Sequence, residues 1–386
     1  MADKLVLHEP HLGGNEWNYI KQCLDTNWIS SSGEYVDLFE ESIASYTLSD
    51  HSVSCVNGTA ALQIGLSLLG VRPNDEVIVP TITFIATVNA IHYNGAHPVF
   101  MDVDSIGNID SEKTIEFIKQ ETVFRDGCSH NKVSNRKISA IVLVHVFGNA
   151  ANLEDLLPLC EERNIQVLED AAESLGTWYT DGKYAGRHTG TLGQVGCLSF
   201  NGNKIITAAA GGMILTDNAA MADRARYLIT QAKDDRIYYR HDEVGYNYRL
   251  TNIQAAIGLA QFEQLPMFLE KKRENYESYR DALEYVDGYE IASVPTYAKN
   301  NHWLTILRIT TEIAPKKLDT VVDLFEEKNI EVRPIWLPNH LQKPYINAQG
   351  YKIEEAENIV RRSVCLPSGF NLTNEHVTRV VSCLAG

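Results

Sequence analysis

Residues 138–170 read ISAIVLVHVFGNAANLEDLLPLCEERNIQVLED, and they contain two apolar runs separated by a helix-like segment. The runs Ile138–His145 and Ile165–Glu169 are too short for helices and nearly continuous, as in strands buried on both faces. Leu153–Arg163 lies between them and follows Asn152, a residue type that often caps a helix N-terminus. Strand, helix and strand in this order predict an α/β domain with a mostly parallel sheet.

The alternation of strand-like and helix-like segments extends over most of the chain. Ala60–Leu69 is helix-like and ends at Gly70, and Ala219–Ile229 is helix-like and follows Asn218. Further short apolar runs are Val53–Val56, Val77–Val79, Val99–Val103, Gly196–Phe200 and Met213–Thr216. The polar segment Asp126–Lys137 has little apolar content, so we expect it to be a surface insertion.

A long helical stretch marks the expected boundary between two domains. It begins at Thr251, is interrupted at Pro266 and continues to about Tyr285. We therefore predict a large domain over residues 1–250 and a smaller one over residues 251–386, on which the N-terminal segment could pack.

The pattern of the last part of the chain is typical of a small α+β domain. From Trp303 onward it predicts a strand, a helix over Pro315 to Lys328 and a second strand. A proline-rich turn near Pro334–Pro338 and two further helix candidates complete this part.

The composition narrows the class of protein. The 386 residues include 34 basic and 50 acidic side chains, a formal net charge of -16, so the overall positive charge of nucleic-acid binders is missing. The N-terminus MADKLVLHEPHLGG lacks a secretory signal, and no stretch stays apolar for the roughly 20 residues that span a bilayer. The seven cysteines form no Cys-x-x-Cys pair. We expect a cytoplasmic protein with reduced thiols, no membrane segment and no metal site.

Two segments combine polar residues with the predicted ends of strands. Asn57–Leu62, NGTAAL, follows a strand and opens a helix, where free backbone amides can receive a phosphate. An ordinary tight turn with a threonine cap explains the same residues. Asp170 follows an apolar strand, where parallel sheets present ligand-binding groups and a carboxylate can pair with a protonated ring nitrogen. A helix-capping aspartate explains this position equally well.

The third segment is Cys197–Lys204, CLSFNGNK, in which a strand runs into a small polar loop that ends in a lysine. A lysine in a protected pocket loses its proton more easily than one in water, and the free amine can attack a carbonyl. A lone lysine is usually a solvated surface residue. The order of the three segments along the chain favours the chemical interpretation.

The chain resembles the fold-type I sugar aminotransferase family named after the DegT/DnrJ/EryC1/StrS proteins. The resemblance extends over nearly the whole sequence. The matching segments are Gly13–Glu16, Asn57–Leu62, Pro80–Thr87, His145–Asn149, Glu169–Glu173, Ser199–Lys204, Gly245–Leu250, Arg333–Trp336 and Cys365–Ser368. It implies a large domain with a mostly parallel, seven-stranded sheet, a smaller C-terminal α+β domain, and pyridoxal 5'-phosphate (PLP) as the cofactor.

The resemblance also implies roles for single residues. Lys204 would be the Schiff-base lysine, Asp170 would keep the pyridine nitrogen protonated, and Phe84 would lie against the ring face. The phosphate would be held by Gly58, Thr59, Ala60 and Ser199. Asn247 and Arg249 would come from the neighbouring subunit of a homodimer with shared active sites. Dimerisation would then be a condition of activity.

The implied reaction is amino transfer from L-glutamate to a keto sugar carried by a nucleotide. The cofactor would act as the electron sink and Lys204 as the proton carrier. The segment before Ile138 and the His145–Asn149 segment most resemble the branch that aminates C4 of UDP- or GDP-linked 4-keto-6-deoxy-2-acetamido sugars. The expected acceptor is UDP-2-acetamido-2,6-dideoxy-4-hexulose, on the way to bacillosamine- or legionaminic-type sugars of the cell surface. Amination at C3 is the alternative.

Several positions leave more than one interpretation open. Glu173 could lie near the cofactor hydroxyl or the sugar, or be a helix cap or a surface residue. Arg333, His340 and Trp336 could meet the substrate, while Arg333 could equally be a structural ion-pair partner. Relatives commonly have a Thr-Gly-rich run where this chain has Ala208–Ala210, which leaves open a PLP-binding sensor without turnover.

Two other enzyme classes are disfavoured by particular residues. A related branch of the family dehydrates sugars and has histidine at the position of Lys204. A nicotinamide-dependent oxidoreductase would need a G-x-G-x-x-G turn between a strand and a helix, which this sequence lacks.

Overall fold

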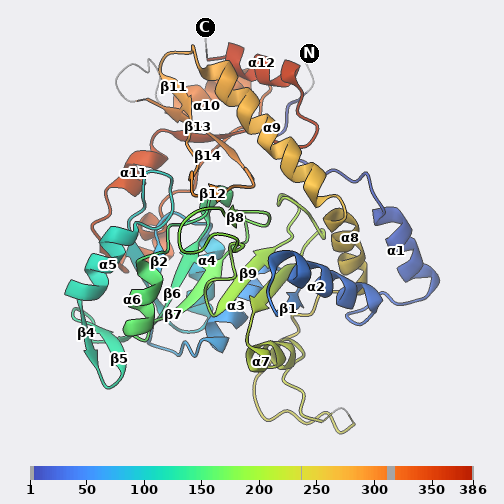
Figure 1. Ribbon diagram of the computed structural model, residues 1–386, viewed down its shortest axis with the longest axis vertical. Coiled ribbons are helices and arrows are strands. Elements are labelled where there is room, and N and C mark those ends of the chain that lie inside the picture. The colour runs from blue at the N-terminus through green and yellow to red at the C-terminus, as the bar shows by residue number, and fades with distance from the viewer. Residues whose placement is uncertain (1–3, 236, 311–317, 385–386) are drawn as a thin grey trace.

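A computed structural model of the chain describes residues 4–235, 237–310 and 318–384 (Figure 1). Its centre is a ten-stranded sheet whose main path has the order β1-β10-β9-β7-β6-β2-β3-β15. The bounds are β1 His51–Cys55, β10 Gly212–Thr216, β9 Val195–Ser199, β7 Gln166–Asp170, β6 Lys137–Val144, β2 Glu76–Pro80, β3 His97–Met101 and β15 Gln349–Tyr351. Along this path only β10 runs antiparallel to its neighbours. The predicted α/β class with a mostly parallel sheet is confirmed.

Three strands extend the sheet beyond the expected seven. One is β15, which pairs with β3 although it comes from the C-terminal part of the chain. The other two are β4 (Thr122–Arg125) and β5 (Cys128–Asn131), an antiparallel hairpin whose second strand pairs with the start of β6. The segment expected to be a surface insertion, Asp126–Lys137, therefore contributes a strand to the sheet.

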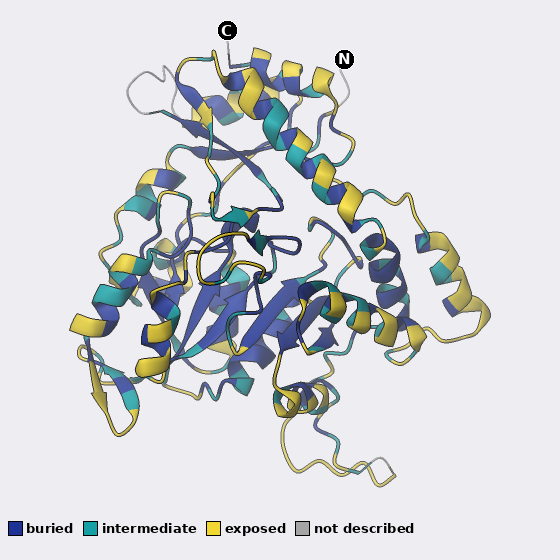
Figure 2. Cartoon of the chain, in the orientation of Figure 1, coloured by how far each residue is buried: buried dark blue, intermediate teal, exposed yellow. Residues whose placement is uncertain are grey.

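Helices flank the sheet, whose central strands are buried (Figures 1 and 2). The helices of this part of the chain are α1 Glu16–Asp25, α2 Glu34–Thr47, α3 Gly58–Leu68, α4 Ile85–Tyr93, α5 Ser111–Gln120, α6 Leu156–Glu162 and α7 Ala219–Ile229. Helix α6 begins later than predicted, because Asn152 accepts the N–H of Glu154 in a turn and Asp155 takes the N-cap position.

The predicted long helical stretch consists of α8 (Asn252–Phe262) and α9 (Leu265–Leu283). Thr251 and Gln254 form a capping box at the start of α8, which confirms the predicted cap. The interruption lies just before Pro266, not at it. Proline is tolerated in the first turn of α9 because that position needs no intrahelical N–H donor.

The C-terminal part forms a second layer around a four-stranded antiparallel sheet with the order β11-β13-β16-β14. Its elements are β11 Tyr289–Ile291, β13 Thr305–Ile309, β14 Arg333–Pro334, β16 Ser363–Leu366, α10 Leu318–Glu327, α11 Glu355–Val360 and α12 Asn374–Ser382. A short pair, β8 Trp178–Tyr179 and β12 Ala298–Lys299, and the 3-10 turns Val146–Gly148, Asn339–Leu341 and Lys343–Tyr345 complete the chain. The expected start of α10 at Pro315 lies outside the described residues.

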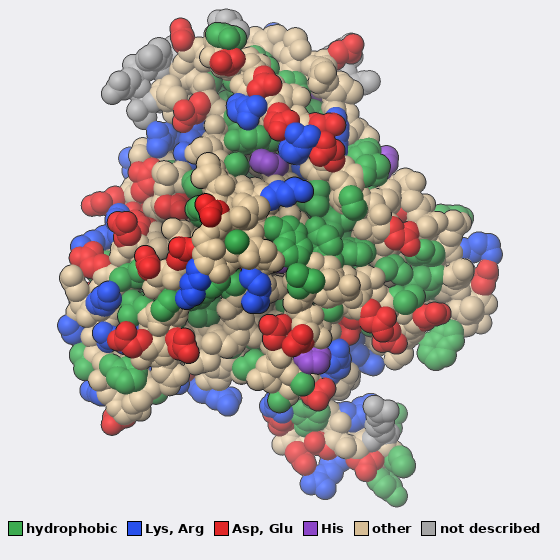
Figure 3. Space-filling model, in the orientation of Figure 1, with side chains coloured by type: hydrophobic (Ala, Val, Ile, Leu, Met, Phe, Trp, Pro, Cys, Tyr) green, Lys and Arg blue, Asp and Glu red, His purple; other side chains and the backbone are tan. Residues whose placement is uncertain are grey.

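The N-terminal segment packs on this C-terminal layer. Leu5 bridges to Ile330 and belongs to the hydrophobic cluster formed by α9, α10, α12 and the four-stranded sheet. Acidic and basic side chains are interspersed over the face shown in Figure 3. Within the described ranges, the structure contains no helix that is both long and apolar enough to cross a membrane.

Candidate active site

A cleft of about 610 Å³ opens where the carboxyl ends of β7 and β9 meet the N-terminus of α3. Most of the residues predicted for the site line it together. They are Gly58, Thr59, Phe84, Asp170, Glu173, Ser199, Lys204, Arg333 and Trp336. The last two come from the C-terminal part, so the cleft lies between the large sheet and the C-terminal layer.

The N-terminus of α3 forms one end of the cleft. Asn57 is the N-cap and its side chain accepts the N–H of Ala60 at 2.8 Å. This corrects two expectations: the cap is not a threonine, and Ala60, which does not line the cleft, has its N–H occupied. Gly58, Thr59 and Ser199 remain as candidates for holding an anion at the positive end of the helix.

Gly58 has no room for a side chain. A Cβ atom built there would lie 2.9 Å from Cβ and 3.1 Å from Oγ of Ser199. We expect Gly58→Ala to push Ser199 away from the cleft and to weaken PLP binding by about tenfold or more, measured by equilibrium titration. Gly202→Ala is the matched control, because a Cβ there meets nothing within 4 Å. Equal losses in the two variants would contradict the assignment of this end of the cleft to the phosphate.

Asp170 is the buried acid of the cleft. It ends β7, and its Oδ2 accepts the hydroxyl of Thr87 at 2.6 Å while Oδ1 accepts the N–H of Ala172 at 3.1 Å. Burial raises the pKa of Asp170, and these hydrogen bonds and the nearby Lys204 oppose that rise. A carboxylate held in this way is stabilised further by any cation that enters the cleft.

Lys204 follows β9 in the loop that the sequence predicted. Its side chain is 13% exposed, and Nζ lies 3.5 Å from Oε1 of Glu173. Nζ also lies 4.1 Å from the ring centroid of Trp303, within the range of a cation–π contact. The amine therefore lies between an aromatic face and a carboxyl group, and Lys204 lines the cleft.

Glu173 is not a surface residue. It is buried, and its Oε2 accepts the N–H of Phe147 at 2.9 Å. Burial raises the pKa of Glu173 to about 7, against the opposing effect of Lys204. Near neutral pH this carboxyl group can thus either hold a proton or give one up.

The raised pKa of Glu173 predicts a pH-dependent stability in the cofactor-free protein. The pKa of this side chain is 4.5 in the unfolded chain and about 7 in the folded one. Between these two pH values Glu173 is ionised in the unfolded chain but keeps its proton in the folded chain. The stability that this group contributes is therefore fully present below about pH 4.5 and is lost as the pH rises through about 7. As the pH rises over this range, the free energy of unfolding of the wild type should fall by up to about 3 kcal/mol relative to that of Glu173→Gln. Both are measured in denaturant titrations. Parallel pH curves for the two proteins would refute this.

The loop after the lysine contains Ala208–Ala210 and is held by Thr207. The Thr207 hydroxyl donates to the Phe200 carbonyl at 3.2 Å and accepts the N–H of Ala209 at 2.9 Å. Ala209 has a φ of 63°, a left-handed conformation that glycine adopts more easily. Ala210 lines the cleft, so the alanine run forms part of its wall.

Besides Ala60, three predicted site residues do not line the cleft of this chain. His340 does not line it: its Nδ1 lies 2.7 Å from Oγ1 of Thr81 and its Nε2 3.7 Å from Oε1 of Glu357. Asn247 and Arg249 precede α8 and are not among the residues that line the cleft. Nε of Arg249 is buried and has no hydrogen-bond partner among the residues that the structure describes.

Phe84 and Trp336 are aromatic residues that line the cleft. Phe84 is 54% exposed, and its ring centroid lies 6.2 Å from that of Trp336. The buried Phe147, which does not line the cleft, stacks on Trp336 at 5.0 Å. Arg333 is exposed and also lines the cleft. It forms an ion pair with Glu331 at 2.6 Å, which is one of the two roles that the sequence suggested for it.

Sequence reasoning missed three residues near the lysine and the acid. Thr87 binds Asp170, and Trp303 and His8 line the cleft next to Lys204. Thr87 lies in the matching segment Pro80–Thr87, so its position was a usable signal. Trp303 and His8 are remote from the motifs along the chain and carry no comparable signal.

The cleft fits PLP in three respects. A helix N-terminus next to Ser199 can receive a phosphate, the buried Asp170 can pair with a protonated pyridine nitrogen, and Lys204 presents an enclosed amine. A mostly parallel α/β sheet with these groups at its strand ends defines the fold-type I class of PLP-dependent enzymes.

The chain belongs to the DegT/DnrJ/EryC1/StrS aminotransferase family, because the sequence model of that family matches residues 10–385. It is 37% identical to the putative pyridoxal phosphate-dependent aminotransferase EpsN of Bacillus subtilis (strain 168), covering 100% of this chain and 96% of that protein. It is also 37% identical to the GDP-perosamine synthase of Escherichia coli O157:H7, covering 97% and 95%. The crystal structure of DesI with its TDP-sugar product superposes with a TM-score of 0.87 at 27% identity, covering 100% and 93%. The chain is therefore a PLP-dependent sugar aminotransferase.

Proposed function

We propose that this aminotransferase moves an amino group from L-glutamate to C4 of a nucleotide-linked 4-keto-6-deoxy sugar in the synthesis of a cell-surface glycan. The observation that carries the proposal is the single cleft in which Lys204, Asp170 and Glu173 lie next to the N-terminus of α3. The names of the relatives support a nucleotide-linked sugar, because they specify GDP-perosamine and a TDP-sugar.

We assign the steps of the reaction to residues of the cleft. PLP, when bound, supplies the electron sink for the carbon that carries the amine. Nζ of Lys204 takes the proton from the α-carbon of glutamate, and later returns a proton to the sugar carbon. Asp170 keeps a negative charge at the buried end of the cleft, and Glu173 holds or releases a proton 3.5 Å from Nζ.

The mouth of the cleft has groups suited to the acceptor. Trp336 and Phe84 present aromatic surface, and Arg333 presents a cation beside it. An aromatic surface and a guanidinium group match the base or sugar ring and the phosphates of a nucleotide sugar.

The regiochemistry and the nucleotide are tested by offering glutamate with keto sugars of defined structure. The first acceptor is UDP-2-acetamido-2,6-dideoxy-4-hexulose, the bacillosamine- and legionaminic-type precursor expected from the sequence. A GDP-linked 4-keto-6-deoxyhexose without the acetamido group and a 3-keto sugar are the comparisons. Amino products are identified by mass and by the position of the new amine in NMR spectra. Conversion of only the 3-keto sugar would reject amination at C4, and no bleaching of the cofactor absorbance by glutamate would favour a sensor.

We further propose a homodimer in which Asn247 and Arg249 complete the cleft of the other subunit. Their absence from the lining of this chain's cleft and the unpartnered Nε of Arg249 among the described residues support it. Mixing Lys204→Ala and Arg249→Ala subunits should then restore about a quarter of the activity, because half of random dimers are mixed and each has one intact site. Measured activity equal to the sum of the two separate variants would contradict the shared site.

A further inference from the structure

Trp303 contacts the lysine of the cleft in two ways. Its ring centroid lies 4.1 Å from Nζ of Lys204. Its indole Nε1 donates a hydrogen bond of 2.6 Å to the carbonyl of Asn203, the residue before the lysine. Trp303 is only 2% exposed, so neither contact is shared with solvent to a large extent. One side chain thus holds both the amine and the backbone that carries it.

The backbone of Trp303 is held in turn by buried polar groups. Its N–H donates to Oδ1 of Asn301 at 2.9 Å, and Nδ2 of Asn301 donates to the carbonyl of Glu173 at 2.8 Å. Its carbonyl accepts from Nζ of Lys272 at 2.9 Å. The position of Trp303 is therefore linked both to the Asp170–Glu173 segment and to helix α9.

Lys272 is an unusual group to bury. It is 4% exposed, and no carboxylate of the described residues lies within 4.0 Å of it. Burial lowers the pKa of Lys272 to about 7. Its Nζ donates to the carbonyls of Trp303 and Ser368, the latter at 2.6 Å, and lies 3.3 Å from Nδ1 of His8.

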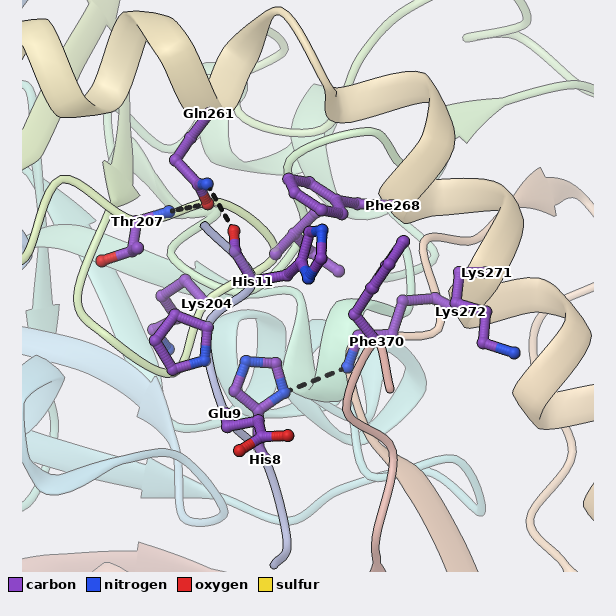
Figure 4. Close-up of a pocket in the computed structure, with 12 residues that line it drawn as sticks. His8, Glu9, His11, Lys204, Thr207, Gln261, Phe268, Lys271, Lys272 and Phe370 are labelled. Atoms are coloured by element: carbon purple, nitrogen blue, oxygen red, sulfur yellow. Dashed lines mark hydrogen bonds between the residues drawn. The ribbon is translucent and has the colours of Figure 1, made fainter. Parts of the chain in front are cut away.

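The contact with His8 leads back to the lysine. The His8 ring lies between Lys272 and Lys204, and a dashed line joins it to Lys272 in Figure 4. His8 lines the main cleft as well as the small cavity behind Lys204. Two of the three polar neighbours of Lys272, Trp303 and His8, therefore also line the cleft that contains Lys204.

We propose that Trp303 is a positioning residue for the amine of Lys204, and that Lys272 keeps Trp303 and His8 in the places where they enclose that amine. A lysine side chain has four rotatable bonds, and an aromatic face on one side limits the directions in which its nitrogen can point. A buried amine without a carboxylate costs stability, and an apolar side chain would fill the same space without that cost. Lys272 holds Trp303 and His8, which line the cleft with Lys204, and this role explains why a lysine is kept at that position. The inference rests on the proposed role of Lys204 in holding the cofactor.

The ring and the indole N–H are tested separately in the PLP-loaded protein. Trp303→Phe keeps a ring and removes the hydrogen bond to Asn203, whereas Trp303→Leu removes both. The pH midpoint of the visible absorbance of the bound cofactor should fall by about 0.5 to 1 unit in Trp303→Leu and by less in Trp303→Phe. In both variants kcat should fall by about tenfold while KM for glutamate changes by less than about threefold. Both variants keep Asp170, Glu173 and His8, the other titratable groups that interact with Lys204, so a shift of the pH midpoint reports on Trp303.

Lys272→Met tests the support behind Trp303, and Lys271→Met is its matched control. Lys271 is the neighbouring residue but pairs with Glu274 at 3.7 Å near the surface. We expect Lys272→Met to reproduce the lower pH midpoint of Trp303→Leu and Lys271→Met to keep that of the wild type. Wild-type midpoints in both Trp303 variants and in Lys272→Met would overturn the inference. Borohydride trapping with mass spectrometry tests the proposed function separately. If the trapped cofactor in the wild type were attached to a residue other than Lys204, the proposed function would be refuted.

Discussion

Lys204→Ala should lower the rate of amino transfer by at least about 10⁴-fold, because the variant loses both the covalent link to the cofactor and the proton carrier. With alanine at this position, no amine lies between Glu173 and Trp303. The rate is measured in single turnovers with the cofactor in excess, so that weaker binding does not hide the chemical effect.

Lys204→Arg is the informative companion variant. It keeps a positive charge near Glu173 but cannot form the link or release a proton at neutral pH. We expect it to be as inactive as Lys204→Ala. A rate near that of the wild type in either variant, or borohydride-stable cofactor on another lysine, would remove Lys204 from the centre of the reaction.

The second large effect is expected for Asp170→Asn, with kcat lower by roughly 10²-fold or more and weaker binding of PLP. Asparagine keeps the size of the side chain but cannot offer a full negative charge to a protonated ring nitrogen. Asp170 is buried, so water cannot replace the missing charge. The readouts are the single-turnover rate and the cofactor dissociation constant.

Thr87→Val separates the charge of Asp170 from its orientation. It removes the 2.6 Å hydrogen bond to Oδ2 but leaves the carboxylate in place. The loss should be clearly smaller than in Asp170→Asn. Equal losses in both variants would mean that geometry, and not charge, is what this residue contributes.

Fold class and the main chemical groups could be predicted from the sequence because they depend on local patterns. Continuous apolar runs alternating with capped helices indicate buried parallel strands, and the carboxyl ends of such strands meet at one edge of the sheet. Asp170 and Ser199 end two of these strands, and Lys204 follows five residues after the second. Their meeting in one cleft therefore followed from their order along the chain.

Other features depended on packing between segments that are distant in the sequence. One local feature was missed as well: Asn57, not a threonine, caps α3 and occupies the N–H of Ala60, because side chains at a helix start compete for the same donors. His340 was expected near the substrate, yet the turn that carries it docks on Thr81. The hairpin within Asp126–Lys137 found a partner in β6, which a polar composition does not reveal.

The sequence by itself determined the α/β class, the family, and the lysine and acid of the cleft, because strand ends and cap positions are set by neighbouring residues. Only the tertiary structure decided which residues enclose the lysine. Trp303 and His8 line the cleft beside it, Lys272 holds both of them, and the three residues come from separate parts of the chain. Contacts of this kind depend on how the C-terminal layer and the N-terminal segment pack on the sheet, and no periodicity or spacing along one segment encodes that packing.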